Sequence, residues 1–144
     1  KGMRKKPEVM EKVFWKLGDQ ILKYMELVKE YGGDLISYAD SSGGVNILGP
    51  KMMEAVTVNF TYPFLKKVEQ LADDKTMILL CPKTTLALIG TEKAKFVDHQ
   101  LEEPIGYAQA CIHMIGKAHF AGQMCIKNVG YQLNHGIFKE VKLL

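Results

Sequence analysis

The sequence has a single arginine, three cysteines and no apolar run as long as a membrane span. Arg4, alone among 19 basic residues, cannot supply the repeated bidentate contacts by which proteins bind phosphates and bases. The net charge of +3 is also too small to predict nucleic acid binding. A transmembrane helix needs about 20 consecutive apolar residues, so no membrane span is predicted. The sequence therefore favours neither a nucleic-acid-binding protein nor a membrane protein.

The start of the chain has no segment with the charged, apolar and small-residue order of a signal peptide. Three cysteines are an odd number, which favours free thiols or metal ligands over disulfide bonds. These two features predict a cytoplasmic protein. The rest of the composition, 47% hydrophobic and 24% charged, is that of a globular protein, and 144 residues fit one domain.

The spacing of apolar residues predicts alternating helices and strands. Apolar positions between Pro7 and Tyr31 recur every three or four residues, as in an amphipathic helix. Met77–Cys81 is a continuous apolar run, typical of a strand that is buried on both faces. Pro63 is expected to kink or divide a second long helix. In chain order, we expect helices at 7–31, 50–72, 84–93, 106–117 and 133–144, and strands at 34–40, 77–81, 94–100 and 118–124.

One helix followed by four strand–helix units predicts an α/β fold with parallel strands and right-handed crossovers. Two architectures fit this order: a small doubly wound sheet, or part of a (β/α)8 TIM barrel. Because a complete barrel needs about 250 residues, four units make about half of one. The chain stops inside the helical pattern of 133–144 without a cap, which indicates that residues 1–144 are part of a longer protein. A half barrel exposes unpaired strand edges, so we expect a homo-oligomer or a flanking chain segment.

Candidate functional residues follow from the predicted strand ends. In both architectures, functional groups gather beyond the carboxyl ends of the strands. There the sequence places Asp40, Cys81, His99 and Glu102, so we expect their side chains to share one mouth. Asp40, His99 and Glu102 are candidates for polar, catalytic roles in that mouth. Histidines within strands are, however, more often hydrogen-bonded structural residues than metal ligands.

The cysteines differ in what their surroundings predict. Cys81 is followed by Pro82 at a strand end, where a thiol serves as a metal ligand or a nucleophile, or simply as a small buried side chain. The pattern around Cys81 does not decide between these roles. Cys111, inside a predicted helix, and Cys125 are more typical of packing residues.

Several segments of the chain together resemble the uroporphyrinogen decarboxylase superfamily. The family shows a strand that ends in Asp and small residues, then a Ser-Pro-Lys segment, then a Pro-Tyr-Leu-Lys-Lys segment. The corresponding segments here are Gly33–Gly43, Leu48–Glu54 and Tyr62–Lys67, and Met77–Thr85 resembles the next strand. The resemblance implies the central to C-terminal part of a (β/α)8 barrel.

The resemblance is closest to the methylcobamide:coenzyme M methyltransferase branch. Enzymes of that branch move a methyl group from a corrinoid to a thiol, which is bound by zinc held on one His and two Cys. Cys81 matches the first family Cys, whereas Leu79 stands at the position of the His, and the second Cys lies beyond this chain. The resemblance thus implies zinc at Cys81 and a methyl-corrinoid, which is a substrate or is carried by a partner protein. A small-molecule substrate or a corrinoid protein is the expected partner.

Two other functions remain open. Decarboxylation of a tetrapyrrole, the reaction of the name-giving branch, needs arginines to bind many carboxylates, and this chain offers only Arg4. A non-catalytic binding or scaffold module is favoured by Leu79 in place of the family His.

Overall fold

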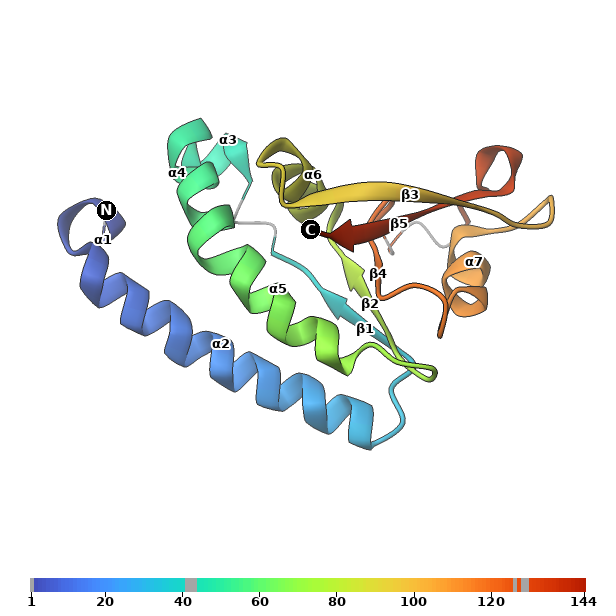
Figure 1. The fold of residues 1–144 in the computed structure, drawn as a ribbon, viewed down its shortest axis with the longest axis horizontal. Coiled ribbons are helices and arrows are strands. Elements are labelled where there is room, and N and C mark those ends of the chain that lie inside the picture. Colours follow the sequence, from blue (N-terminus) through green and yellow to red (C-terminus); the bar gives the residue numbers. More distant parts are fainter. Residues whose placement is uncertain (1, 41–43, 126, 128–129) are drawn as a thin grey trace.

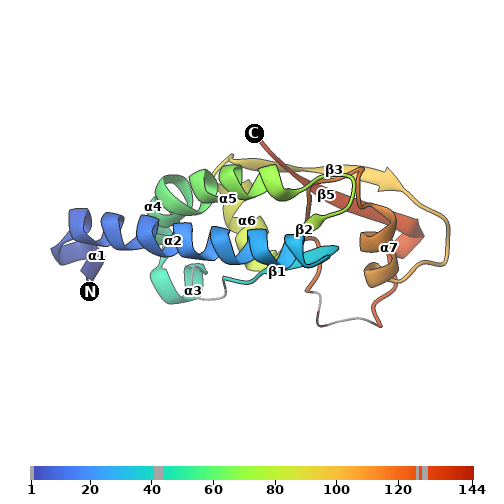
Figure 2. The ribbon, with the colours of Figure 1, turned by 90° about the horizontal axis from the view of Figure 1, so that it is seen from below.

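In this computed structural model of the protein, residues 2–40, 44–125, 127 and 130–144 are described. They form a five-stranded sheet with helices on both faces (Figures 1 and 2). The helices and turns are α1 (Gly2–Lys5), α2 (Pro7–Glu30), α3 (Val45–Leu48), α4 (Pro50–Val56), the π-turn η1 (Thr57–Thr61), α5 (Tyr62–Val68), η2 (Glu69–Leu71), α6 (Pro82–Gly90), α7 (Tyr107–His113) and η3 (Asn134–Gly136). The strands are β1 (Leu35–Tyr38), β2 (Met77–Leu80), β3 (Ala94–Gln100), β4 (Phe120–Ala121) and β5 (Ile137–Leu143).

The strand order in the sheet is β1-β2-β4-β5-β3. β1, β2 and β4 are parallel, with Leu35 opposite Met77 and Tyr38 opposite Leu80. β5 runs antiparallel to both of its neighbours, β4 and β3. The α/β class is confirmed, and three of the expected strands are parallel to one another. The sheet as a whole is mixed.

Two expectations about the second half of the chain are wrong. The helix expected at 133–144 is instead the short turn η3 followed by β5. The strand at 94–100 forms, but it lies at the sheet edge and pairs antiparallel with β5 instead of lying parallel beside β2. Both corrections follow from β5. The segment expected as a helix forms this strand, which lies between β4 and β3 and runs antiparallel to both. β3 is therefore separated from the parallel strands.

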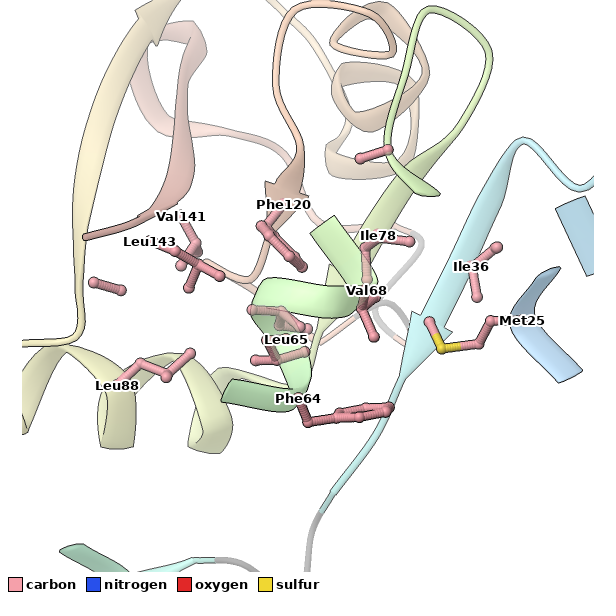
Figure 3. Close-up of a cluster of buried hydrophobic side chains, with 13 residues drawn as sticks. Met25, Ile36, Phe64, Leu65, Val68, Ile78, Leu88, Phe120, Val141 and Leu143 are labelled. Atoms are coloured by element: carbon pink, nitrogen blue, oxygen red, sulfur yellow. The ribbon is translucent and has the colours of Figure 1, made fainter. Parts of the chain in front are cut away.

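Alternation along β2 divides the core into two clusters of buried residues. Ile78 and Leu80 belong to a cluster that includes residues of α2, α5 and α6 (Figure 3). Met77 and Leu79 belong to a cluster built around α7. Since successive side chains of a strand point to opposite faces, β2 is buried on both sides, as its continuous apolar run predicted.

The helix expected at 50–72 is divided just before Pro63. α4 leads into the five-residue π-turn η1, and α5 starts at Tyr62. Proline has no N–H to donate to the preceding turn, and a single π-helical turn such as η1 interrupts the α-helical hydrogen-bond pattern at this point. The predicted division is therefore confirmed.

α2 packs along α5 on one side of the sheet (Figure 1). A Cβ at Gly18 of α2 would lie 3.3 Å from the Phe64 ring of α5, so the small residue sets this close approach. Among α2 residues only Met25 is fully buried, whereas Leu17 and Tyr24 are 54% and 69% exposed. A wide apolar surface of α2 is therefore open to its surroundings.

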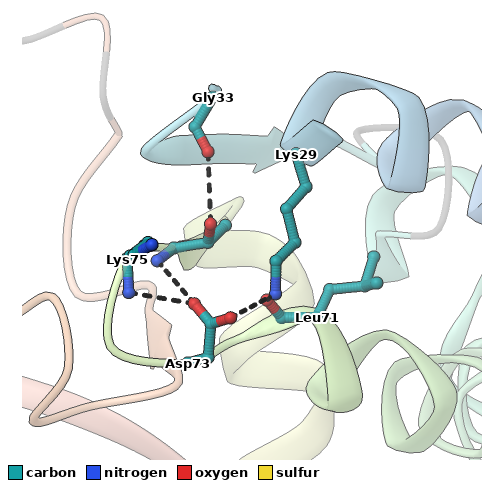
Figure 4. Close-up of polar contacts among 6 residues, drawn as sticks. Lys29, Gly33, Leu71, Asp73 and Lys75 are labelled. Carbon is teal, nitrogen blue, oxygen red and sulfur yellow. Dashed lines mark hydrogen bonds and ion pairs between the residues drawn. The ribbon is translucent and has the colours of Figure 1, made fainter. Parts of the chain in front are cut away.

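A group of polar contacts around Asp73 ties the segment that precedes β2 to the end of α2 (Figure 4). The Lys29 ammonium, near the end of α2, forms an ion pair with Asp73 and donates to the Leu71 carbonyl at 2.9 Å. The Asp73 carboxylate also accepts from the backbone N–H of Lys75 and Thr76, at 2.9 and 3.0 Å. The Lys29 hydrogen bond and these N–H donors hold the pKa of Asp73 below its usual value.

Candidate functional site

A half-open cavity of about 300 Å³ lies at the carboxyl end of β1. Its walls come from α2, α4, η1 and α5, and its floor from the residues that end β1. Most of the described lining residues are apolar, five of the twelve are aromatic, and Asp40 is the one with a charged side chain. The aromatic residues that line it are Phe14, Trp15, Tyr38, Phe60 and Phe64.

Two features of the local structure create this cavity. The π-turn η1 carries Phe60, whose ring stacks on Phe14 of α2 with centroids 4.6 Å apart. Gly18, one turn along α2 from Phe14, leaves room for Phe64, whose ring lies 5.6 Å from that of Tyr38. Four of the five aromatic side chains of the wall thus meet in two pairs.

Tyr38 and Asp40 bring polarity to the floor of the cavity. Burial raises the pKa of Tyr38 to about 12, and the nearby negative charge of Asp40 acts in the same direction. The Tyr38 hydroxyl therefore stays protonated at neutral pH and remains a hydrogen-bond donor. Asp40 itself is half-buried. The cavity thus combines a negative charge with an apolar, aromatic wall.

Cys81 lies beside this floor, at the end of the neighbouring strand. Tyr38 and Leu80 are paired in the parallel ladder, and the Cys81 N–H donates to the Tyr38 carbonyl at 3.2 Å. The Cys81 thiol is half-buried at the residue that precedes α6. Adjacent parallel strands therefore bring the segments of Asp40 and Cys81 side by side, although Cys81 is not among the described residues of the cavity wall.

His99 and Glu102 lie elsewhere in the molecule. His99 is on β3, which β4 and β5 separate from β2 in the sheet. Its Nε2 lies 2.8 Å from Glu140 Oε2, across the β3–β5 pair. Glu102 is exposed in the segment after β3. The structure therefore brings two of the four predicted site residues, Asp40 and Cys81, to one place.

The cysteines and histidines do not assemble into a metal site in the part of the chain that the structure describes. No group of three or more His, Cys, Asp or Glu residues there has the arrangement to hold a metal ion. Leu79, which stands where the resemblance implies a ligand His, is buried. Cys111 is buried in α7, which raises the pKa of its thiol to about 11, and Cys125 is exposed. The donor set thus does not fit the zinc site that the resemblance implies.

The aromatic wall is the part of the site that the sequence analysis missed. Phe14 belongs to the apolar face predicted for the helix at 7–31, and Phe60 lies in the helix predicted at 50–72. The available signal was the clustering of Phe14, Trp15 and Gly18 on one helix with Phe60 and Phe64 four residues apart on another. Aromatic residues at such spacings are normally predicted to be core residues. Here they line a cavity because α2 and α5 pack beside each other.

Comparison of the chain with protein-family models, curated proteins and solved structures finds no match in any of the three. Among the described residues, no helix is both long enough and apolar enough to span a membrane.

Proposed function

We propose that this chain is part of a uroporphyrinogen decarboxylase-like enzyme that transfers a methyl group from a corrinoid to a thiol acceptor. A small-molecule substrate of that reaction occupies the cavity at the end of β1. The observation that carries the proposal is the pairing of β1 with β2, which sets Asp40 of this cavity beside Cys81. Both residues belong to segments on which the family resemblance rests.

The proposal also covers part of the fold. We propose that the parallel strands β1, β2 and β4 belong to the wall of a (β/α) barrel, with their carboxyl ends at the mouth. Their parallel pairing and the helices that follow β1 and β2 support this assignment. β5 and β3 depart from an all-parallel barrel, so the barrel-like part is confined to the three parallel strands.

The described residues of the cavity favour binding and orientation over metal chemistry. Aromatic side chains exclude water, while Asp40 and the protonated Tyr38 hydroxyl offer one negative charge and one donor to a substrate. When bound, a methyl-corrinoid supplies the activated methyl group. No step passes through zinc, because Cys81 has no fitting co-ligands among the described residues.

The cavity favours methyl transfer over tetrapyrrole decarboxylation. A tetrapyrrole with many carboxylates needs cationic partners, whereas the charged residue of the described wall is Asp40, which is negative. Arg4 lines a separate hollow, beside Leu48 and Pro50. A negative, aromatic cavity suits a neutral or positively charged substrate.

The test is a methyl-transfer assay with methylcobalamin and the neutral thiol 2-mercaptoethanol, followed by the change in the cobalamin absorption spectrum. We expect demethylation above a protein-free control and a loss of rate in Asp40→Asn. Glu26→Gln, which removes an exposed carboxylate of α2 outside the cavity, is the matched control and should keep the rate. Binding of methylcobalamin without any demethylation would favour the scaffold function, and loss of carboxyl groups from a uroporphyrinogen would favour the decarboxylase.

The partner proposal rests on the open surface of α2 and the free edge of β1. β1 is the outer strand of the sheet, and apolar residues on α2 such as Leu17 and Tyr24 are more than half exposed. Burying such a surface is favourable, so this side is proposed to be covered by a second copy or by flanking chain. Light scattering checks the first alternative, since a strictly monomeric chain at all concentrations would rule out the homo-oligomer.

A further inference from the structure

The cavity at the end of β1 has a chemistry that distinguishes between classes of substrate. Five aromatic side chains line it, and the charged member of its described wall is the carboxylate of Asp40. Aromatic rings attract cations through the negative potential of their faces, and an anion nearby adds to this attraction. An anionic ligand would meet repulsion from Asp40 and would find no lysine or arginine in the described wall.

We propose that this cavity binds a small organic cation with a methylated ammonium group, held by the aromatic wall and by Asp40. The proposal rests on the function proposed above in taking the cavity as the site of the small-molecule acceptor, and it adds that this acceptor carries a methylated ammonium group. A methylated ammonium spreads its charge over apolar methyl groups, so it loses little hydration when aromatic walls surround it. A primary ammonium or a metal ion is more strongly hydrated and fits such a wall less well.

A cation already lies on one ring of this wall. The Lys67 ammonium is 4.6 Å from the centre of the Trp15 ring, and 4.0 Å from Asp19 Oδ1. This ring therefore already holds positive charge within the fold, on the face that Lys67 covers. Because Lys67 is tethered to α5, it does not replace a free ligand at Tyr38 and Asp40 on the floor.

The size of the cavity agrees with this class of ligand. About 300 Å³ is at the lower end of the range for small-molecule sites, so it suits a compact cation better than a tetrapyrrole. The wall offers polar atoms at Asp40, Tyr38 and Thr61 for a second functional group of the ligand. Choline, which joins a trimethylammonium to a hydroxyl, has both features and serves as the probe.

The experiment measures binding through the fluorescence of Trp15, the single tryptophan of the chain. Choline is titrated into the protein beside 3,3-dimethylbutanol, its neutral isostere, and beside 3,3-dimethylbutyrate, an anion of similar shape. We expect choline to bind about tenfold or more tightly than the neutral isostere, and the anion not to bind. Equal affinity of choline and 3,3-dimethylbutanol would overturn the proposal in favour of a purely apolar ligand.

Two variants locate the effect, each with a matched control. Asp40→Asn should weaken choline binding about tenfold and leave 3,3-dimethylbutanol unchanged, whereas Glu26→Gln should change neither. Phe14→Leu should weaken choline binding, whereas Tyr24→Leu, at an aromatic that is 69% exposed on α2, should not. Choline binding that survives both Asp40→Asn and Phe14→Leu would place its site elsewhere and overturn the proposal. Calorimetry confirms the affinities independently of fluorescence.

These outcomes are separate from those of the methyl-transfer assay, because binding needs no corrinoid and no turnover. Choline binding without methyl transfer contradicts the proposed reaction and keeps the cation site. Methyl transfer without choline binding contradicts the cation site and keeps the proposed reaction.

Discussion

The Thr85 hydroxyl of α6 points at the position that a Cβ would take on Gly122, the residue that follows β4. Thr85 is fully buried, and its Oγ1 has no hydrogen-bond partner among the described residues. Val141 and Leu80 also lie within 3.2 Å of that Cβ position. The first turn of α6, just after Cys81, is therefore packed directly on the chain that leaves β4.

Replacing Gly122 with alanine should destabilise the protein by about 1–3 kcal/mol, because the new methyl group overlaps Thr85 Oγ1 in a packed interior. Urea denaturation measures the change in the free energy of unfolding. Gly90→Ala is the matched control: nothing lies within 4 Å of its Cβ position at the end of α6, so it should be neutral or slightly stabilising.

Thr85→Ala should restore part of the stability lost in Gly122→Ala, since it removes the atom that the new methyl group meets. A double-mutant cycle gives the coupling between the two positions. Gly122→Ala that unfolds at the wild-type urea concentration would contradict the contact.

The tyrosines make stability fall in alkaline solution. Tyr38 has its pKa raised to about 12, first by burial and then by the charge of Asp40, and burial also raises the pKa of Tyr107. A group whose pKa is higher in the folded state stabilises it below the unfolded pKa and loses that effect as pH rises to the folded value. We therefore expect the free energy of unfolding to fall between about pH 10 and 12.

Tyr38→Phe should make this alkaline loss shallower, since it removes one of the two tyrosine ionisations. Tyr24→Phe, at an exposed position, should leave the slope unchanged. Urea denaturation at fixed ionic strength and several pH values gives the slopes. Identical slopes for the wild-type protein and Tyr38→Phe would show that Tyr38 is not shielded from solvent.

The three cysteines should differ in their rates of alkylation. Burial raises the pKa of Cys111 to about 11, which leaves about a hundredfold less thiolate than an ordinary thiol at neutral pH. Cys125 is exposed and should react first with iodoacetamide, with half-buried Cys81 between the two. Peptide mapping by mass spectrometry measures the rates, and all three should converge in urea. Folded protein whose Cys111 reacts as fast as Cys125 would contradict the packing of α7.

Zinc content tests the role that the family resemblance implies for Cys81. Because Leu79 stands where the resemblance implies a ligand His, and no fitting ligand group is found in the described residues, we expect equal zinc in the wild-type protein and in Cys81→Ser. Elemental mass spectrometry after incubation with zinc and desalting measures the metal. A full equivalent of zinc that disappears in Cys81→Ser would restore Cys81 as a ligand.

Local sequence patterns predicted the elements that carry their own periodicity. The amphipathic helix up to Glu30, the buried strand at 77–80 and the division before Pro63 all follow from side-chain spacing or from the missing proline N–H. The side-by-side placement of Asp40 and Cys81 followed from one further rule, that carboxyl ends of parallel strands meet at one edge.

What the sequence did not predict depends on partners that are distant in the chain. No local pattern near His99 indicates that β3 pairs with β5 and not with β2. The ends of all four strands were therefore expected at one edge of the sheet, whereas β3 is not a neighbour of β2. The cavity wall has the same difficulty. From the sequence alone, Phe14 and Phe60 are predicted to be core residues. They line a cavity because α2 and α5, which are distant in the chain, leave a space between the two helices.

The segment 137–143 shows how a strand and a helix share one pattern, and it offers a sharp test. Phe138 and Val141 are three residues apart, so a helix would place them on the same face. In β5 they point to opposite faces: Phe138 packs with α7, and Val141 with the cluster of α5 and α6. Both side chains are fully buried, so truncation at either position leaves a void in one cluster only.

Phe138→Ala should therefore speed amide hydrogen exchange in α7, and Val141→Ala should speed it in α5 and α6. Each substitution should also lower the free energy of unfolding, by about 3–5 kcal/mol for Phe138→Ala and less for Val141→Ala. Exchange measured by mass spectrometry under native conditions separates the two patterns, with exposed Ile112→Ala as a control that should affect neither. Because a helix at 137–143 would bury both side chains against the same neighbours, matching exchange patterns from the two variants would refute β5.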